Sequence, residues 1–222
     1  MMKGFKMKNL TIRLETEKDY KAVENLTREA FWNMYVPGCD EHYLVHMMRS
    51  HEDFIPELAF VIEKDGEIIG NIMYTKTKLV DECGSEKPIL TFGPISVLPA
   101  YQRQGYGKMI IEHSLEKALS LGYDTVVIFG NPSNYVSRGF KSCKKYNVCL
   151  EGDVFPASLL VKELCEGALD GRKRYFREST VGEVCADTAA VAAFDATFPQ
   201  KEKAWQPSQE EFYINSHSSI IR

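Results

Sequence analysis

The chain has 222 residues, of which 44% are hydrophobic and 26% charged, and its formal net charge is −4. These values are typical of a soluble globular protein, and a chain of this length can bury roughly 70% of its unfolded surface. The 27 Lys and Arg residues form no long basic patch against 31 Asp and Glu, so we expect no nucleic-acid partner. No apolar run reaches about 18 residues, so we also expect no membrane partner.

Six cysteines are scattered through the chain without a Cys-x-x-Cys pair. This spacing argues against a zinc ribbon or a thioredoxin motif, and it favours reduced thiols in a cytoplasmic protein. Residues 1–8 are basic, but no apolar run follows them. We therefore do not expect a signal peptide.

Strand and helix patterns alternate in the first half of the chain. Residues 9–14 alternate apolar and polar side chains, which predicts a strand. Thr16 and Asp19 resemble a capping box, and the apolar spacing behind them predicts a helix to about Asn33. The later expected elements are a helix capped by Asp40, strands over 57–63 and 67–77 joined by an Asp65-Gly66 turn, and a strand over 89–98 with a bulge at Gly93-Pro94.

The second half of the chain begins with a compact turn and an amphipathic helix that Gly122 should end. Thr125–Phe129 is short and apolar, as in a strand buried on both faces. Asn131-Pro132 fits the N-cap and first position of a short helix. We expect strands over 143–150 and 157–163, then an extension over 167–222 with a helix over 184–196 and another from Ser208.

The turn over 102–108 is the most informative segment, because Gly105 and Gly107 let the backbone curl and aim several N–H groups inward. The helix that follows adds unpaired N–H groups and the positive end of its dipole, so the turn favours a phosphate. It is not a Walker A loop, since Met109 stands where Ser or Thr should be. It is not a dinucleotide fingerprint either, since the third glycine is missing.

In its context this turn resembles the acyl-CoA loop of the GNAT superfamily of N-acetyltransferases, Gln/Arg-x-x-Gly-x-Gly/Ala. The order of elements agrees over residues 10–165, and the resemblance is most specific over 93–140, which includes Tyr135-x-x-x-Gly139-Phe140. Within the superfamily, Gly93-Pro94, Val97 and Gly130-Asn131-Pro132 match a bacterial branch. The resemblance implies an α/β GNAT fold. Its central sheet is mixed, mostly antiparallel and splayed between the fourth and fifth strands, with helices on both faces. We expect this acetyltransferase domain over 8–166 and a C-terminal extension, 167–222, packed on the core.

The resemblance also implies acetyl-CoA as co-substrate. Its pantetheine arm would lie in the splay along Ile95 and Val97, and its pyrophosphate on the backbone amides of the turn. Asn131 is expected to cap the short helix, which leaves Asn134 for the pantetheine. The expected cofactor-binding residues are Ile95, Val97, Gln102, Arg103, Gln104, Gly105, Tyr106, Gly107, Lys108 and Asn134.

Acetyl transfer needs a neutral amine and a proton for the departing thiolate. Tyr135 stands where many GNAT relatives carry a general acid, and a phenol with a pKa of about 10 stays protonated at neutral pH. The alternative is a tyrosine that only packs on the sheet. The strand over 89–98 has no acidic residue, so the base stays open between a water chain, Glu29, Asp40, Glu41 and His42. His42 and His46 have the spacing of a metal pair but no third ligand, so we expect no metal.

The resemblance also implies that the acceptor approaches the side built from the first two helices and their linker, here residues 31–41. This linker combines aromatic side chains with two carboxylates, which suits a cationic substrate. We expect Phe31 and Met34 to belong to the core. The expected substrate-binding residues are Trp32, Tyr35, Asp40 and Glu41.

The sequence therefore predicts an enzyme that transfers an acetyl group from acetyl-CoA to a primary amine, directly within a ternary complex. The acceptor is a small molecule or an exposed amino group. Two alternatives stay open: a non-catalytic acyl-CoA sensor or partner-binding module, and a transferase of a larger acyl group. The extension either covers the acceptor cleft or forms a homodimer contact.

Overall fold

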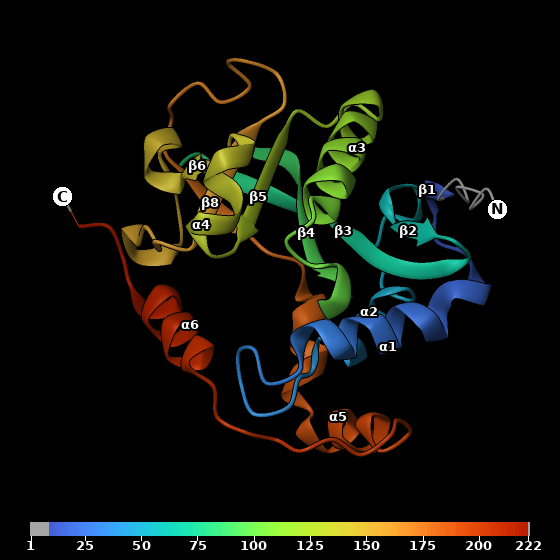
Figure 1. Cartoon of the computed structure of the whole chain (residues 1–222). Helices are drawn as coiled ribbons and strands as arrows, with labels where there is room; N and C mark the ends of the chain where they lie inside the picture. The colour runs from blue at the N-terminus through green and yellow to red at the C-terminus, as the bar shows by residue number, and fades with distance from the viewer. Residues whose placement is uncertain (1–8, 222) are drawn as a thin grey trace.

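A mixed sheet forms the framework of the molecule, and the hairpin signals in the sequence set its first strands. The computed structural model describes residues 9–221. Within them the path of strands is β1-β2-β3-β4-β5-β8-β6, and β9 pairs with both β3 and β7 (Figure 1). The strands are β1 (Leu10–Leu14), β2 (Phe60–Lys64), β3 (Glu67–Asp81), β4 (Glu86–Val97), β5 (Thr125–Phe129), β6 (Lys141–Ser142), β7 (Val148–Cys149), β8 (Leu159–Glu163) and β9 (Arg174–Arg177).

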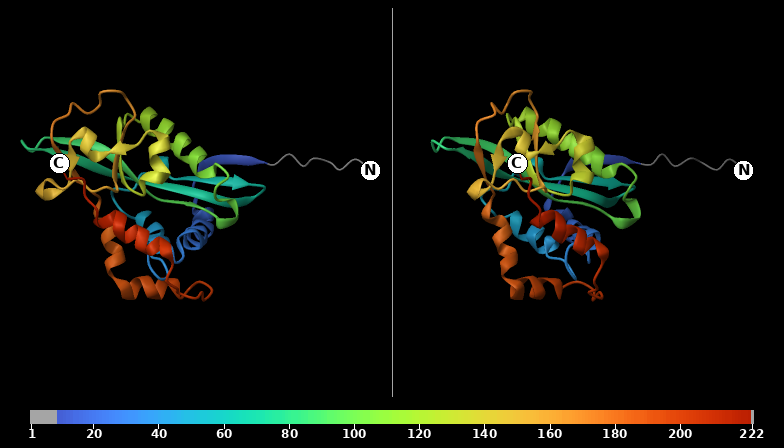
Figure 2. Two further views of the ribbon diagram at one scale, coloured as in Figure 1. Left: turned by 60° about the vertical axis from the view of Figure 1, so that its left-hand side comes forward. Right: turned by 90° about the vertical axis from the view of Figure 1, so that its left-hand side faces the viewer.

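The helices cover both faces of this sheet. Figure 2 shows α1 and α2 below it and α3 above it. One apolar core packs α3 against the sheet through side chains such as Ile110 and Leu115, and another packs α1 and α2 against it through Val23 and Val45. The α-helices are α1 (Tyr20–Phe31), α2 (Glu41–Met48), α3 (Tyr106–Ser120), α4 (Pro132–Tyr135), α5 (Thr188–Asp195) and α6 (Pro207–His217).

The sheet opens between β4 and β5, as the resemblance implies. These parallel strands pair at a single position, Leu90 with Val126. The register of β4 on β3 shifts between Ile72 and Tyr74, directly opposite Gly93-Pro94. Because proline has no N–H to donate to a ladder, the bulge forms where the sequence predicts it. The expected mixed, mostly antiparallel sheet and its splay are confirmed.

Several expected turns and caps are confirmed. Thr16 and Asp19 form the capping box. Asp65 and Gly66 both have positive φ, 52° and 87°, as a tight hairpin turn requires. Gly122, with φ of 92°, follows α3, and the Asn131 side chain accepts a hydrogen bond from the Ser133 amide at the start of α4.

The strand expected over 143–150 is partly wrong, because a 3₁₀ helix over Cys143–Tyr146 replaces its first half and only Val148–Cys149 forms a strand, β7. Ser142 caps this helix by accepting a hydrogen bond from the Lys144 amide, and Asn147 ends it in the left-handed conformation with φ of 55°. The helix expected over 184–196 is partly wrong. A 3₁₀ segment over Thr180–Ala186 comes first, and Asp187 caps α5 through the Ala190 amide.

The extension passes around the side of the molecule that carries α1, α2 and their linker (Figures 1 and 2). It starts with β9, which the sequence did not predict and which pairs with the far end of β3 over Lys78–Asp81, beyond the reach of β2. The chain then descends past α2, carries α5, and returns through α6 toward α4 (Figures 1 and 2).

Side chains on α1 and its linker hold the extension in place. Asp195 contacts the Arg28 guanidinium at 2.6 Å, and the Trp32 indole donates a hydrogen bond to the Glu202 carbonyl. Near the end of the chain, Phe212 stacks on Tyr35 with ring centroids 4.4 Å apart.

Within residues 9–221 no helix has the length and apolar character needed to cross a bilayer. The basic start of the chain, residues 1–8, lies outside the described residues.

Candidate active site

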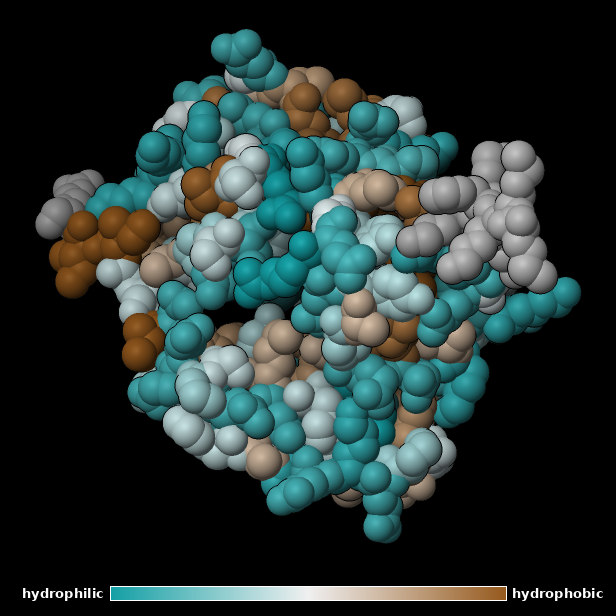
Figure 3. Space-filling view, in the orientation of Figure 1, coloured by the Kyte–Doolittle hydropathy of each residue, from teal (hydrophilic) through white to brown (hydrophobic). Residues whose placement is uncertain are grey.

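A cavity of about 230 Å³ lies where β4 and β5 diverge. Three layers of the molecule contribute to it: the open sheet, the first two helices with their linker, and the extension. The space-filling view shows this face hollowed between the part that carries α4 and the part that carries α6 (Figure 3). The lining residues are Phe31, Tyr35, Glu41, Leu44, Met48, Thr75, Thr91, Phe92, Gly93, Pro94, Ile95, Phe129, Tyr135, Glu178, Ser179, Val181 and Gly182.

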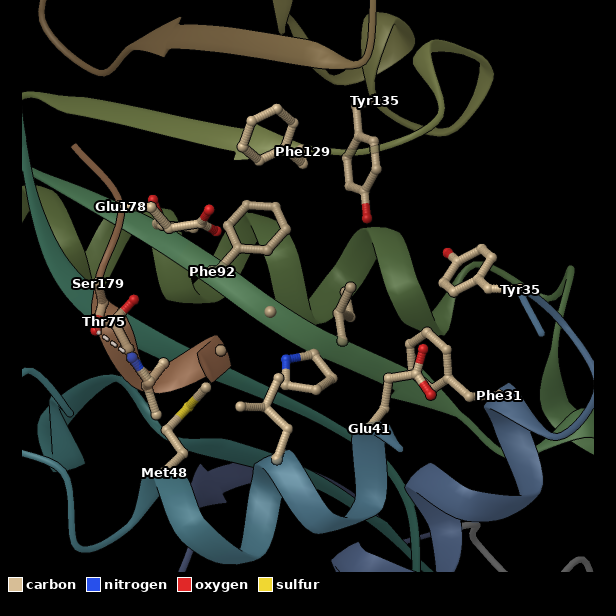
Figure 4. Close-up of a pocket in the computed structure, with 17 residues that line it drawn as sticks. Phe31, Tyr35, Glu41, Met48, Thr75, Phe92, Phe129, Tyr135, Glu178 and Ser179 are labelled. Carbon is tan, nitrogen blue, oxygen red and sulfur yellow. Dashed lines mark hydrogen bonds between the residues drawn. The ribbon is translucent and has the colours of Figure 1, made fainter. Parts of the chain in front are cut away.

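Tyr135 comes from the end of α4 and directs its hydroxyl into this cavity (Figure 4). Its ring packs against Phe92 and Phe140, with centroids 5.9 Å and 5.8 Å away. A Cβ at Gly130 would lie 2.5 Å from the Tyr135 ring, so only glycine fits there without moving the tyrosine. Burial raises the pKa of the Tyr135 phenol. The group therefore stays protonated through the physiological range and can donate a proton.

Glu41 enters the same cavity from the first residue of α2 (Figure 4). One of its carboxylate oxygens accepts a weak hydrogen bond from the Asp40 amide at 3.2 Å. Burial, with a smaller contribution from the charge of Asp40, raises the pKa of the Glu41 carboxyl to about 8. A carboxylate with a pKa in that range is a far stronger base than an exposed glutamate.

Tyr35 forms the wall of the cavity beside Glu41, between the rings of Phe31 and Phe212. Burial raises the pKa of its phenol as well. The cavity thus brings together Tyr135 and two of the four expected acceptor residues, Tyr35 and Glu41. Phe31 is both a core residue and part of the wall.

The other residues considered for the acceptor side lie outside this cavity. Trp32 contacts the extension, and Asp40 lines a separate cavity with residues of α5. Among the other base candidates, Glu29 forms an ion pair with Lys201 at 2.8 Å. His42 is fully buried between α2 and α5, where desolvation lowers its pKa to about 4.

The expected phosphate loop surrounds the start of α3. Gly105 is the N-cap, with φ of 91°, and an added Cβ there would meet nothing within 4 Å. The Gln102 side chain donates to the Val97 carbonyl, and the Gln104 side chain donates to the Ala100 carbonyl. These two glutamines therefore brace the loop, and the amides at the start of α3 stay free of helical partners.

The remaining expected cofactor residues follow the same edge. Ile95 lines the cavity, and Val97 ends β4 next to the loop. Arg103 and Lys108 are exposed beside the loop, while Asn134 is exposed on α4 and does not line the cavity. The loop and the cavity thus lie along one edge of β4, so a long ligand could occupy both.

Comparison with known proteins agrees with this geometry. Residues 27–141 match the acetyltransferase (GNAT) family. The chain belongs to this family. It is 26% identical over 163 residues to the uncharacterised N-acetyltransferase YhbS of Escherichia coli, a match that covers 73% of this chain and 92% of that protein. It is also 29% identical over 101 residues to YjhQ of E. coli K12, covering 45% of this chain and 55% of that protein.

Solved structures show the same fold. The GNAT-family N-acetyltransferase YhbS from E. coli, crystallised with CoA, superposes with a TM-score of 0.68 at 22% identity, covering 78% of this chain and 92% of that one. A Brucella melitensis GNAT-family acetyltransferase in complex with acetyl-CoA gives a TM-score of 0.62, also at 22% identity, covering 78% and 98%. The expected GNAT fold is therefore confirmed for this N-acetyltransferase.

Sequence reasoning missed the part of this acetyltransferase's cavity that the extension supplies. Glu178, Ser179, Val181 and Gly182 all line it. No local motif marks them, because β9 delivers them from the other end of the chain. Within the described part of the chain, no three His, Cys, Asp or Glu side chains form a group that could hold a metal ion.

Proposed function

We propose that this acetyltransferase transfers the acetyl group of acetyl-CoA directly to a primary amine, carried by a small molecule or exposed as an amino group. Glu41 acts as the base and Tyr135 as the acid. The observation that supports this proposal is that both side chains reach one cavity at the splay, from opposite layers. The free amides at the start of α3 lie along the same strand edge and suit a pyrophosphate.

The reaction assigned to these groups has three steps. The Glu41 carboxylate removes a proton from the acceptor ammonium, because an alkyl amine with a pKa near 10 is otherwise protonated. The neutral nitrogen attacks the thioester carbonyl, and the C–S bond breaks as the tetrahedral intermediate collapses. The Tyr135 hydroxyl gives its proton to the departing thiolate, and the second proton lost by the attacking nitrogen returns to the Tyr135 phenolate. Glu41 releases its proton to solvent. The products are an amide and CoA.

The experiment that tests this function is thiol release from acetyl-CoA with a library of primary amines, with mass spectrometry of the product. We expect N-acetylated product and one equivalent of CoA. If acetyl-CoA binds and no amine in the library is acetylated, the sensor alternative replaces the enzyme. If a longer acyl-CoA reacts much faster than acetyl-CoA, the acyl group is assigned wrongly.

Gly105→Val is expected to remove most of the stabilisation that acetyl-CoA gives. At 100 times its Kd, a ligand should stabilise the fold by about 2.7 kcal/mol. Valine is strained at φ of 91°, and its side chain would enter the open space in front of the amides. The measurement is thermal unfolding with and without acetyl-CoA.

Gly122→Val is a matched control for that experiment. Gly122 also has positive φ, 92°, with nothing within 4 Å, but it lies at the other end of α3. We expect it to lower the melting temperature of the free protein while keeping the acetyl-CoA shift. Equal shifts in both variants would show that the phosphate loop is assigned wrongly.

Tyr35→Ala is expected to raise the KM of the amine about tenfold, since losing a partly buried aromatic wall costs about 1.4 kcal/mol. The Kd of acetyl-CoA should stay within twofold, because Tyr35 lines the cavity and no residue of the phosphate loop over 102–108 does. Tyr35→Phe keeps the ring and should behave like the wild type. A loss of acetyl-CoA affinity in Tyr35→Ala would contradict the assignment of this wall to the acceptor.

A further inference from the structure

The active-site cavity contains a second carboxylate that the proposed reaction does not use. Glu178 follows β9 directly and precedes the 3₁₀ segment Thr180–Ala186. Its side chain and that of Glu41 lie at opposite ends of the cavity, with Phe92 between them (Figure 4). The two acids are more than a hundred residues apart in the sequence, so only the tertiary fold brings them into one cavity.

The cavity offers these carboxylates no positive charge. None of its lining residues is Lys, Arg or His. No cationic side chain among the described residues contributes to the pKa of either acid, and burial raises the pKa of both. Each ionised acid loses hydration in this partly desolvated cavity, and a bound cation would offset that loss. The charge of the cavity is therefore complementary to a ligand with positive charge at both ends.

The wall between the two acids suits a hydrocarbon linker. Its aromatic rings and aliphatic side chains can bind an apolar chain, and the faces of the aromatic rings also attract cations. Phe92 lies between the two acids, and the other apolar lining residues of the cavity include Phe31, Leu44, Met48, Ile95 and Phe129.

Glu178 also marks where the cavity meets the solvent. It is exposed at one side and lines a second, outer cavity of about 630 Å³. Its neighbour Ser179 donates a 2.7 Å hydrogen bond to Asp53, which fixes the backbone beside it. The basic residues of the outer cavity are Lys76, Lys78 and Arg177, of which Lys78 pairs with Glu86 and Arg177 with Glu151.

We propose that Glu178 is a specificity-determining residue that holds a second cationic group of the acceptor, so that the preferred acceptors are diamines with an apolar linker. One amine meets Glu41 and is acetylated, while the other pairs with Glu178 at the cavity mouth. This inference rests on the proposed function, since it assigns the acceptor of the same site.

The test compares α,ω-diaminoalkanes with 1-aminoalkanes of equal carbon number, for the wild type and Glu178→Gln at pH 8.5. The wild type should favour the diamine in kcat/KM by about tenfold, the value of one charge-assisted hydrogen bond at a partly exposed site. Glu178→Gln should remove that preference by raising the KM of the diamine, with the monoamine unchanged. Glu183→Gln, in the 3₁₀ segment that follows Glu178 but outside the cavity, is the matched control and should keep the preference.

A binding measurement separates this inference from the proposed function. Diamine binding to CoA-saturated protein is measured by calorimetry for the same three proteins. If no amine is acetylated but Glu178→Gln still weakens diamine binding about tenfold, the diamine site stands and the proposed reaction fails. If monoamines react and bind as well as diamines, or Glu178→Gln weakens both classes equally, the diamine site is overturned and the reaction stands.

Discussion

Tyr135→Phe is expected to lower kcat by 10²–10⁴-fold, the usual contribution of a positioned general acid. The substitution keeps the ring against Phe92 and Phe140 and removes only the hydroxyl that enters the cavity. Acetyl-CoA affinity and the melting temperature should therefore change little. The measurement is the initial rate of CoA release at saturating concentrations of both substrates, with a thermal-shift titration of acetyl-CoA beside it.

The nature of the leaving group gives this experiment a second readout. A thioester whose thiol has a lower pKa leaves without help, so it should rescue Tyr135→Phe much more than the wild type. Gly130→Ala provides an independent variant, because its Cβ would displace the Tyr135 ring without altering the phenol. A kcat within threefold of wild type in Tyr135→Phe would leave Tyr135 as a packing residue.

Local signals in the sequence were sufficient for much of the fold and for the loop. The Asp65-Gly66 turn, the Gly122 stop and the Asn131 cap each depend on a residue and its immediate neighbours. Their conformational preferences act over a few residues, and the structure agrees with them. The bulge at Gly93-Pro94 follows from the missing proline N–H and is equally local.

Contacts between distant segments could not be predicted in this way. Trp32 lies outside the apolar face expected for the first helix, and that position favoured a substrate contact. Its indole instead donates a hydrogen bond to the Glu202 carbonyl, 170 residues away. β9 pairs with a part of β3 that extends beyond β2, so its existence depends on the length of another strand. Glu178 reaches the cavity only because of that pairing. Pattern and propensity carry no information about such partners.

The choice among the base candidates illustrates the same limit. Glu29, Asp40 and Glu41 are equivalent in the sequence, as carboxylates on or near the first two helices. Only the three-dimensional arrangement separates them: Glu29 pairs with Lys201, Asp40 faces α5, and Glu41 enters the cavity opposite Tyr135. The surrounding protein then changes its chemistry, because burial makes Glu41 a stronger base.

Glu41→Gln is expected to lower kcat/KM by 10²–10⁴-fold at pH 9. It should also remove the step in the pH profile, which is the rise in rate that the wild type shows as the pH passes through 8. Only the ionised carboxylate can accept a proton. With a pKa of about 8, the active form of Glu41 increases as the pH rises through 8. The wild-type rate should therefore rise about tenfold from pH 7 to pH 9. An acceptor amine with a pKa above about 10 is used, because it stays an ammonium from pH 7 to pH 9 and its own ionisation contributes little to the profile.

Glu29→Gln is the comparison variant, since Glu29 is a carboxylate on the neighbouring helix that does not line the cavity. It should keep the wild-type profile, with its midpoint near pH 8. Loss of the step in Glu29→Gln, or an unchanged step in Glu41→Gln, would contradict the assignment of the base.

The same pKa has a consequence for stability that can be measured without any substrate. The carboxyl pKa of Glu41 rises from 4.5 to about 8 on folding, so the folded state holds its proton more tightly than the unfolded state. That contribution to stability is fully present below pH 4.5 and is lost as the pH rises through 8. Glu41→Gln carries no such group, so its stability relative to the wild type should increase from pH 5 to pH 9. Urea unfolding of both proteins at the two pH values measures the difference. If Glu41→Gln is both slower and more stable than the wild type at pH 9, burial of this carboxylate lowers stability in exchange for a stronger base. If the stability difference between the two proteins is the same at both pH values, the Glu41 pKa lies near its ordinary value and Glu41 is not the source of the step.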